Sequence, residues 1–167
     1  MKKEWNGLVT LERLWITNDK NEIIFELFDK KNVLHVQGQT LFLGCMFKDT
    51  AIPSVYYVGL DSRTTLTAPQ TLADLTGEPT TPGYSRQPLT RNTDFELIAD
   101  TNSARVRSAT VSFTASLSNY TATDMFLTTA GTGASGLLIS SVSFGTTVTV
   151  TPTNVVSMKF AMTLGSC

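Results

Sequence analysis

Apolar and polar residues alternate along much of this chain, and alternation with a period of two residues is typical of β-strands that bury one face. The pattern appears first in Leu8–Ile16 and again in Glu22–Phe28, with the turn-forming cluster Thr17–Asn21 between the two runs. This order predicts a β-hairpin near the N-terminus. Neither run alternates cleanly, so we expect both faces of the hairpin to be partly covered, either by the chain's own core or by a neighbouring subunit.

The last third of the chain shows the alternation most clearly. In the segment 155–164, five apolar residues fall on one face of a predicted strand: Val156, Met158, Phe160, Met162 and Leu164. Shorter apolar runs bounded by turn residues predict further strands at 55–60, 87–90, 94–99, 106–115, 125–129, 137–144 and 147–151. Many short strands at regular spacing are typical of a β-sandwich or a jelly roll.

Two segments have helical rather than alternating spacing. A short helix is predicted near residues 38–47, where apolar side chains recur at helical spacing: Leu41, Phe42, Cys45 and Met46. A second is predicted over residues 69–76, because Pro69 suits a first helical turn and Gly77 can close a helix.

Length and composition are sufficient for one folded unit with a hydrophobic core. The 167 residues, of which 41% are hydrophobic, suit a single domain or a domain with an arm. We therefore expect a mainly β fold. It comprises an N-terminal β-hairpin or arm over residues 1–35 and a β-sandwich, jelly-roll-like body with one or two short helices over residues 36–167.

The net charge of −1 gives no electrostatic reason to expect a nucleic acid partner. Residues 101–167 are rich in Thr, Ser and Val and hold few charged residues: Arg105, Arg107, Asp124 and Lys159. Such a hydroxyl-rich surface is common in β-proteins of assemblies, because large like-charge fields oppose the packing of many copies. No apolar run has the length of a transmembrane helix and no targeting segment is evident, so we expect synthesis in a cytoplasm and no membrane partner.

Few residues indicate chemistry. The single histidine, His35, has no carboxylate or cysteine at a metal-ligand spacing. No Gly-x-Ser-x-Gly motif marks a nucleophile, although a Ser–His–Asp arrangement stays open among the many serines. Three glycines in residues 131–136 match GxGxxG, but without a surrounding βαβ unit we interpret them as a hairpin loop. The acidic residues of the middle third are interpreted as solvated loop charges rather than as the paired carboxylates of a glycosidase. We predict no catalytic residue, no metal and no cofactor.

Two cysteines do not make a disulfide framework. Cys45 lies in an apolar segment and is expected to be a free thiol, while Cys167 is the last residue. A bridge between them stays an alternative, which a cytoplasmic origin disfavours.

A segment in the middle of the chain carries a family resemblance. It contains, in order, the strand Tyr57-Val-Gly-Leu60, the second predicted helix, the tripeptide Gly77-Glu-Pro79 and the motif Gly83-Tyr-x-Arg-Gln87. With the upstream Asn32–Gln39, this order resembles a group of small structural proteins of tailed bacteriophages, in which such a segment precedes a run of β-strands. None of these motifs is catalytic, and the resemblance implies a component of the virion.

From this resemblance we expect a non-enzymatic virion structural protein that acts as a capsid decoration or cement protein, or as a collar or connector component. The implied partners are the major capsid or portal and connector proteins, together with other copies of this chain. Aromatic residues and arginine are enriched at interfaces, and the interface candidates are Leu11, Trp15, Phe25, Phe28, Tyr57, Tyr84 and Arg86. A structural role, with Arg86 tied to backbone carbonyls or to Asp61, is the alternative for that residue.

An alternative function is a receptor- or carbohydrate-binding module associated with a tail fibre. It would require a cluster of exposed aromatic residues in a groove, and Trp5, Trp15 and Tyr120 are too scattered to indicate one. A small hydrolase is disfavoured by the missing motifs.

Overall fold

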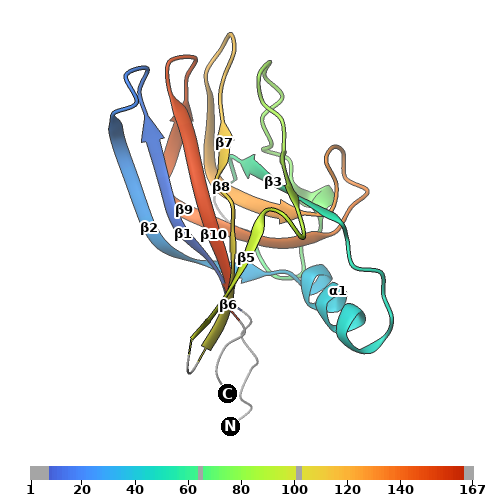
Figure 1. The fold of residues 1–167 in the computed structure, drawn as a ribbon. Coiled ribbons are helices and arrows are strands. Elements are labelled where there is room, and N and C mark those ends of the chain that lie inside the picture. The colour runs from blue at the N-terminus through green and yellow to red at the C-terminus, as the bar shows by residue number, and fades with distance from the viewer. Residues whose placement is uncertain (1–7, 64–65, 101–102, 164–167) are drawn as a thin grey trace.

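The computed structural model describes residues 8–63, 66–100 and 103–163, and within these residues the fold is mainly β (Figure 1). The strands are β1 (Leu8–Thr17), β2 (Ile23–Leu34), β3 (Val55–Asp61), β4 (Gln87–Thr90), β5 (Phe95–Asp100), β6 (Ser103–Ser108), β7 (Val111–Phe113), β8 (Tyr120–Thr128), β9 (Leu138–Val150) and β10 (Val155–Thr163). The helix α1 spans Val36–Phe47, and a single 3-10 turn, η1, spans Leu72–Asp74. The predictions of a mainly β fold and of an N-terminal hairpin are confirmed.

The strands join into one antiparallel sheet that curls on itself until it is nearly closed. Their order is β4-β3-β8-β9-β2-β1-β10-β6-β5, and β7 pairs with β10. β2 connects the two layers, because it pairs with β1 over Ile23–Lys31 and with β9 over Asn32–Leu34. Figure 1 shows β2, β1 and β10 side by side in one layer, and the curved β8 and β9 in the other.

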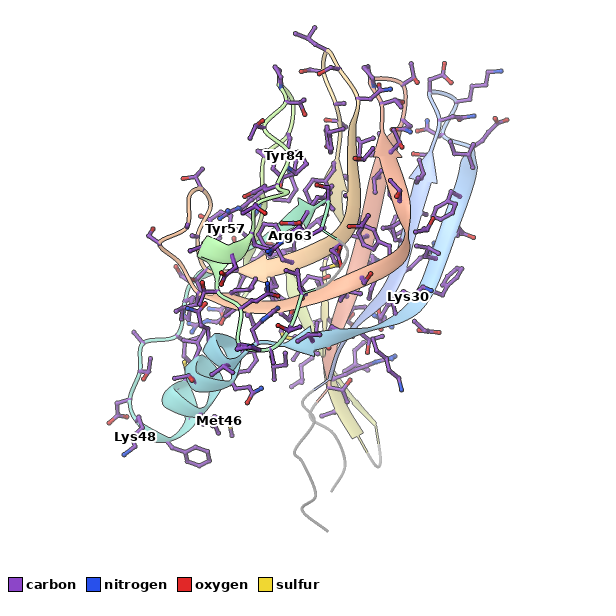
Figure 2. All side chains as sticks on the ribbon, turned by 180° about the vertical axis from the view of Figure 1, so that it is seen from behind. Lys30, Met46, Lys48, Tyr57, Arg63 and Tyr84 are labelled. Atoms are coloured by element: carbon purple, nitrogen blue, oxygen red, sulfur yellow. The ribbon has the colours of Figure 1, made fainter. Side chains whose placement is uncertain are left out.

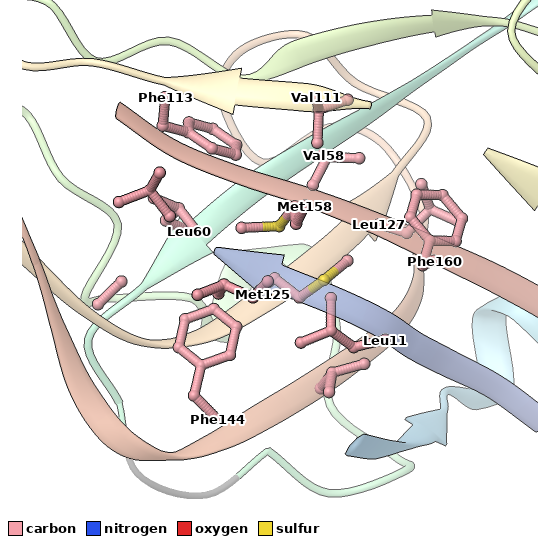
Figure 3. Close-up of a cluster of buried hydrophobic side chains, with 14 of the residues drawn as sticks. Leu11, Val58, Leu60, Val111, Phe113, Met125, Leu127, Phe144, Met158 and Phe160 are labelled. Atoms are coloured by element: carbon pink, nitrogen blue, oxygen red, sulfur yellow. The ribbon is translucent and has the colours of Figure 1, made fainter. Parts of the chain in front are cut away.

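The hydrophobic core lies between these two layers (Figure 3). Leu11, Met158 and Phe160 project into it from β1 and β10, and Val58 and Met125 project from β3 and β8; all five are fully buried. Burying a side chain of this size stabilises the fold by about 1.5–3 kcal/mol. The expected boundary at residue 35 falls between β2 and α1, and the segments on both sides of it share this core.

The hairpin forms where the pattern predicted it, but the alternation of buried and exposed residues along β1 changes phase partway along the strand. The side-chain amide oxygen of Asn18 accepts hydrogen bonds from the backbone N–H groups of Lys20 and Glu22, which closes the turn. Strict alternation along β1 would put Leu11 and Leu14 on opposite faces, yet both are fully buried. The pairing with β10 is irregular between Leu11 and Arg13, and this bulge moves the apolar residues after it onto the buried face.

The helix predicted near residues 38–47 is confirmed as α1. It packs against β9 through Gly38, where a side chain would overlap the carbonyl of Ile139. Leu41 is buried on the same side, and Phe42 and Cys45 pack against the core, with Cys45 present as a free thiol. Cys167 lies outside the described residues.

The helix predicted over residues 69–76 is wrong in extent, because only the single turn η1 forms there. A capping box closes that turn: Thr71 donates its backbone N–H and its hydroxyl to the carboxylate of Asp74. Gly77 then accepts a hydrogen bond from the backbone N–H of Ser62, which draws the chain against the end of β3 instead of continuing a helix.

Strand boundaries in the last third differ from the predicted ones in two places. The long strand predicted over 106–115 is two strands, β6 and β7, which pair with different parts of β10. The strands predicted over 137–144 and 147–151 are one strand, β9, interrupted by a bulge at Gly145, whose φ is 71°. The face predicted for β10 is confirmed at Val156, Met158 and Phe160, which are fully buried; Met162 is partly buried against the core, and Leu164 lies outside the described residues.

Candidate functional site

The most prominent candidate surface lies on the outer face of the β1–β2 hairpin. In the antiparallel register, Arg13 lies opposite Phe28 and Trp15 lies opposite Glu26. The Arg13 guanidinium stacks over the ring of Trp15 at 4.7 Å and over the ring of Phe28 at 5.9 Å, and it also forms an ion pair with Glu26. One arginine therefore orients two aromatic rings on an open face of the sheet.

Apolar side chains extend this surface toward the turn. Phe28 is 53% exposed and Ile24 is 58% exposed, whereas Phe25 and Leu27, on the opposite face of β2, pack against the core. We refer to Arg13, Trp15, Ile24, Glu26 and Phe28 as the hairpin patch. Aromatic residues and arginine are the types enriched at protein interfaces, and exposed apolar patches mark interaction sites.

Two of the seven predicted interface residues, Trp15 and Phe28, belong to the hairpin patch. Leu11 is fully buried, and Phe25 is partly buried and packs against the core from the opposite face of β2, so neither belongs to the hairpin patch. The composition of the hairpin indicated apolar surface but not which face carried it, because the bulge in β1 changes the phase. Arg13 and Ile24, which complete the patch, were not among the predicted residues.

Arg86 and Tyr84 belong to an internal network rather than to an exposed surface. Arg86 donates two hydrogen bonds to the carboxylate of Glu78, each 2.7 Å, and further ones to the carbonyls of Ala130 and Gly133 at 2.8 and 2.9 Å. Its guanidinium also lies over the ring of Phe126. The alternative role given to Arg86, tying its loop to backbone carbonyls, is the role that these contacts support.

The Tyr84 hydroxyl completes this network. It donates to Glu78 at 2.9 Å and accepts from the backbone N–H of Leu60 at 3.0 Å. Burial raises the pKa of this phenol well above its usual range, so it remains a neutral donor. Tyr57, labelled in Figure 2, is half-buried and its ring lies against Gly131, while Arg86 bonds the carbonyl of Gly133, so two side chains contact the residues 131–136. Those residues connect β8 to β9 as a hairpin loop, as interpreted from the sequence.

A buried pair of carboxylates is the most polar feature of the interior. Asp61 and Asp124 face each other in register on β3 and β8, and they are 0% and 1% exposed. The Arg63 side chain approaches Asp61 at 3.5 Å, and the Thr123 hydroxyl donates to Asp124 at 2.6 Å. Burial raises the pKa of Asp124, and the nearby Asp61 adds to this. Both carboxylates are therefore buried between β3 and β8.

His35 is likewise an internal residue. It is fully buried, and its Nε2 lies 2.9 Å from the hydroxyl of Ser141 on β9. Burial lowers the pKa of the imidazole, so it is neutral at physiological pH. Within the described residues, no group of three or more His, Cys, Asp and Glu side chains comes together as metal ligands do.

A second apolar surface surrounds α1. An open groove of about 700 Å³ runs along the helix, and its apolar lining includes Val36, Leu43 and Phe47. Phe47 is 70% exposed, and Met46 also projects from this side of the molecule (Figure 2). Lys30, on β2, lies on the opposite side. The fold therefore carries two separate apolar surfaces.

Comparison with known proteins adds no family. No protein-family model matches the sequence, and no curated protein is significantly similar to it. In the described part of the chain, no helix has both the length and the apolar character needed to cross a bilayer.

Proposed function

We propose that this chain is a non-enzymatic structural component of a bacteriophage particle, either a capsid decoration or cement subunit or a collar or connector component. The hairpin patch is the observation that carries the proposal. It presents two aromatic rings, an isoleucine and one neutralised ion pair on a rigid sheet, which is the chemistry of a protein-binding surface. The assignment to a phage particle comes from the resemblance of roughly residues 5–90 to structural proteins of tailed phages.

The fate of the buried polar groups also supports a structural role. Three buried groups with potential for chemistry form hydrogen bonds within the fold: His35 with Ser141, Asp124 with Thr123, and Arg86 with Glu78. The contacts of His35 and Arg86 hold one chain segment against another, whereas Thr123 and Asp124 are neighbours on β8. A protein that acts by binding a particle surface in many copies requires a stable fold and a contact surface, and no catalytic group.

The carbohydrate-binding alternative has less support. Sugar recognition by tryptophan uses the open face of the ring, and the guanidinium of Arg13 covers one face of Trp15 at 4.7 Å. Phe28 is the other aromatic ring of the hairpin patch, and it packs against the same guanidinium.

The proposal is tested by binding to particles that lack the protein. Purified chain is mixed with such particles, the particles are sedimented, and bound chain is quantified. The double variant Trp15→Ser/Phe28→Ser should bind about tenfold or more weakly, because two large apolar side chains leave the contact. Leu97→Ser is the matched control, since Leu97 is 70% exposed on β5, at the far end of the sheet order from β2.

Two results would contradict the proposal. One is absence of the chain from purified intact particles. The other is equal binding by the wild type, the double variant and the control, which would remove the hairpin patch from the contact. Selective retention on a glycan surface, lost in the double variant, would favour the tail-fibre alternative.

A further inference from the structure

Most of β2, from Ile23 to Lys31, is an open edge of the sheet. Residues Ile23–Lys31 pair with β1 on one side, whereas pairing with β9 on the other side involves only Asn32–Leu34. Among the residues that the structure describes, no strand pairs with Ile23–Lys31 on the side away from β1. Figure 1 shows this part of β2 at the outer margin of its layer. Alternate backbone N–H and C=O groups of the segment therefore face outward without a strand partner.

Within this edge, the stretch Ile23–Phe28 has little of the protection that exposed edges usually carry. Natural edge strands are shielded by charges, prolines or bulges that prevent pairing with another chain. Here Ile23, Ile24 and Phe28 are all about half exposed, and the charge of Glu26 is already paired with Arg13. Asp29, with a φ of 50°, ends the regular stretch. The segment before it offers an extended, apolar template for a further strand.

We propose that this edge pairs antiparallel with the same edge of a second copy of the chain, which joins two sheets across a two-fold axis. The inference deepens the proposed function, on which it rests, by naming the partner of the hairpin. A two-fold contact uses one surface twice, so the surface must be complementary to itself. The apolar residues of β2 and the charges at the two ends of the segment meet this requirement.

The charges at the two ends of the segment are opposite. The turn end carries two carboxylates and one ammonium group, and the far end carries one carboxylate and two ammonium groups: Asp19, Lys20 and Glu22 against Asp29, Lys30 and Lys31. Antiparallel pairing places the turn end of each copy beside the far end of the other. A register centred on Glu26 brings Ile24 opposite Phe28 twice and places the two Glu26 side chains, each paired with its own Arg13, across the axis. It also brings Glu22 of each copy to the end that carries Lys30 and Lys31 of the other. Parallel pairing would instead bring like ends together.

A charge-exchange experiment on the full-length chain tests this pairing. Glu22→Lys and the double variant Lys30→Glu/Lys31→Glu each place like charges at both ends of the contact. Each variant alone should self-associate about 2- to 30-fold more weakly than the wild type by analytical ultracentrifugation, given the strength of exposed ion pairs. An equimolar mixture of the two should recover the wild-type association, because both ends are then complementary. Lys48→Glu, beyond the end of α1, is the control and should leave association unchanged.

Amide hydrogen exchange provides a second readout that reports on the backbone. Protection of alternate amides in residues 23–28 should rise with protein concentration in the wild type, and should not rise in Glu22→Lys alone. A chain that remains monomeric at all accessible concentrations overturns the inference. The inference is also overturned if the chain dimerises but the mixed variants do not recover wild-type association. It is likewise overturned if the concentration-dependent protection lies outside residues 23–28, or if another protein, rather than a second copy, supplies the strand that pairs with this edge. A monomeric chain that still binds particles through the hairpin patch would leave the proposed function standing and refute only the edge pairing.

Discussion

Replacing Arg86 with methionine should be among the most destabilising single substitutions of a polar residue in this protein. The Arg86 side chain is 4% exposed and connects the turn-rich segment before β4 to the loop between β8 and β9. Its loss leaves the Glu78 carboxylate without a counter-ion and leaves two carbonyls without their donor. Methionine retains much of the length and the apolar character of the arginine stem, so the change removes mainly the polar contacts.

The expected loss follows from the burial of the pair. Removing one partner of a buried ion pair destabilises a protein by about 3–5 kcal/mol. The Glu78 side chain is 22% exposed, so water can solvate part of the orphaned charge, and we expect the lower end, about 3 kcal/mol. For a chain of this size, that corresponds to a fall in Tm of about 6–12 °C. Arg86→Lys should recover only part of the loss, because an ammonium group cannot reproduce the bidentate geometry.

Urea denaturation of the wild type and of these variants measures the effect directly. The matched control is Arg13→Met, because the ion pair between Arg13 and Glu26 is exposed on both sides and should contribute less than about 1 kcal/mol. The double variant Arg86→Met/Glu78→Leu should be less destabilised than the sum of its single changes, since it leaves no unpaired charge. If Arg86→Met is no less stable than Arg13→Met, the Arg86 network does not stabilise the fold as described.

Three further predictions address the interior. Burial raises the pKa of Asp124 above its ordinary value of 3.8, so the folded state binds this proton more tightly than the unfolded state. The stability of the wild type relative to Asp124→Asn should therefore rise as pH falls from neutral through the raised pKa toward 3.8, and urea midpoints that run parallel for the two proteins at every pH would contradict this. Gly38→Ala should lower the stability of the protein, because the new methyl group meets the Ile139 carbonyl and this clash outweighs the gain in helix propensity of about 1 kcal/mol. A variant that is stabilised in thermal melts would refute this close packing. Phe160→Ala should lose about 3–5 kcal/mol in denaturant unfolding, whereas Leu117→Ala, at an exposed loop position, should change stability by less than about 0.5 kcal/mol; similar losses would contradict the position of the core.

Local pattern in the sequence was sufficient for the elements whose causes are local. The turn after β1 depends on Asn18 and its immediate neighbours, and α1 follows the spacing of apolar residues over three turns. The buried face of β10 follows from alternation alone, because every second residue of a strand points to the same side. Of the hairpin patch, Trp15 and Phe28 could be named from the sequence. They are large apolar residues in a two-stranded unit that has more apolar side chains than one core-facing side can bury.

Tertiary structure decided the features that depend on distant segments. The bulges near Arg13 in β1 and at Gly145 in β9 set which side chains face the core, and they are set by pairing with β10 and β8. Arg86 meets Ala130, 44 residues away, and Asp61 meets Asp124 only because β3 lies beside β8. The open edge of β2 exists because that strand changes partners partway along its length. Periodicity records the faces of a single element, whereas partners, bulges and edges arise when the elements compete to bury their apolar faces and to satisfy their backbone hydrogen bonds together.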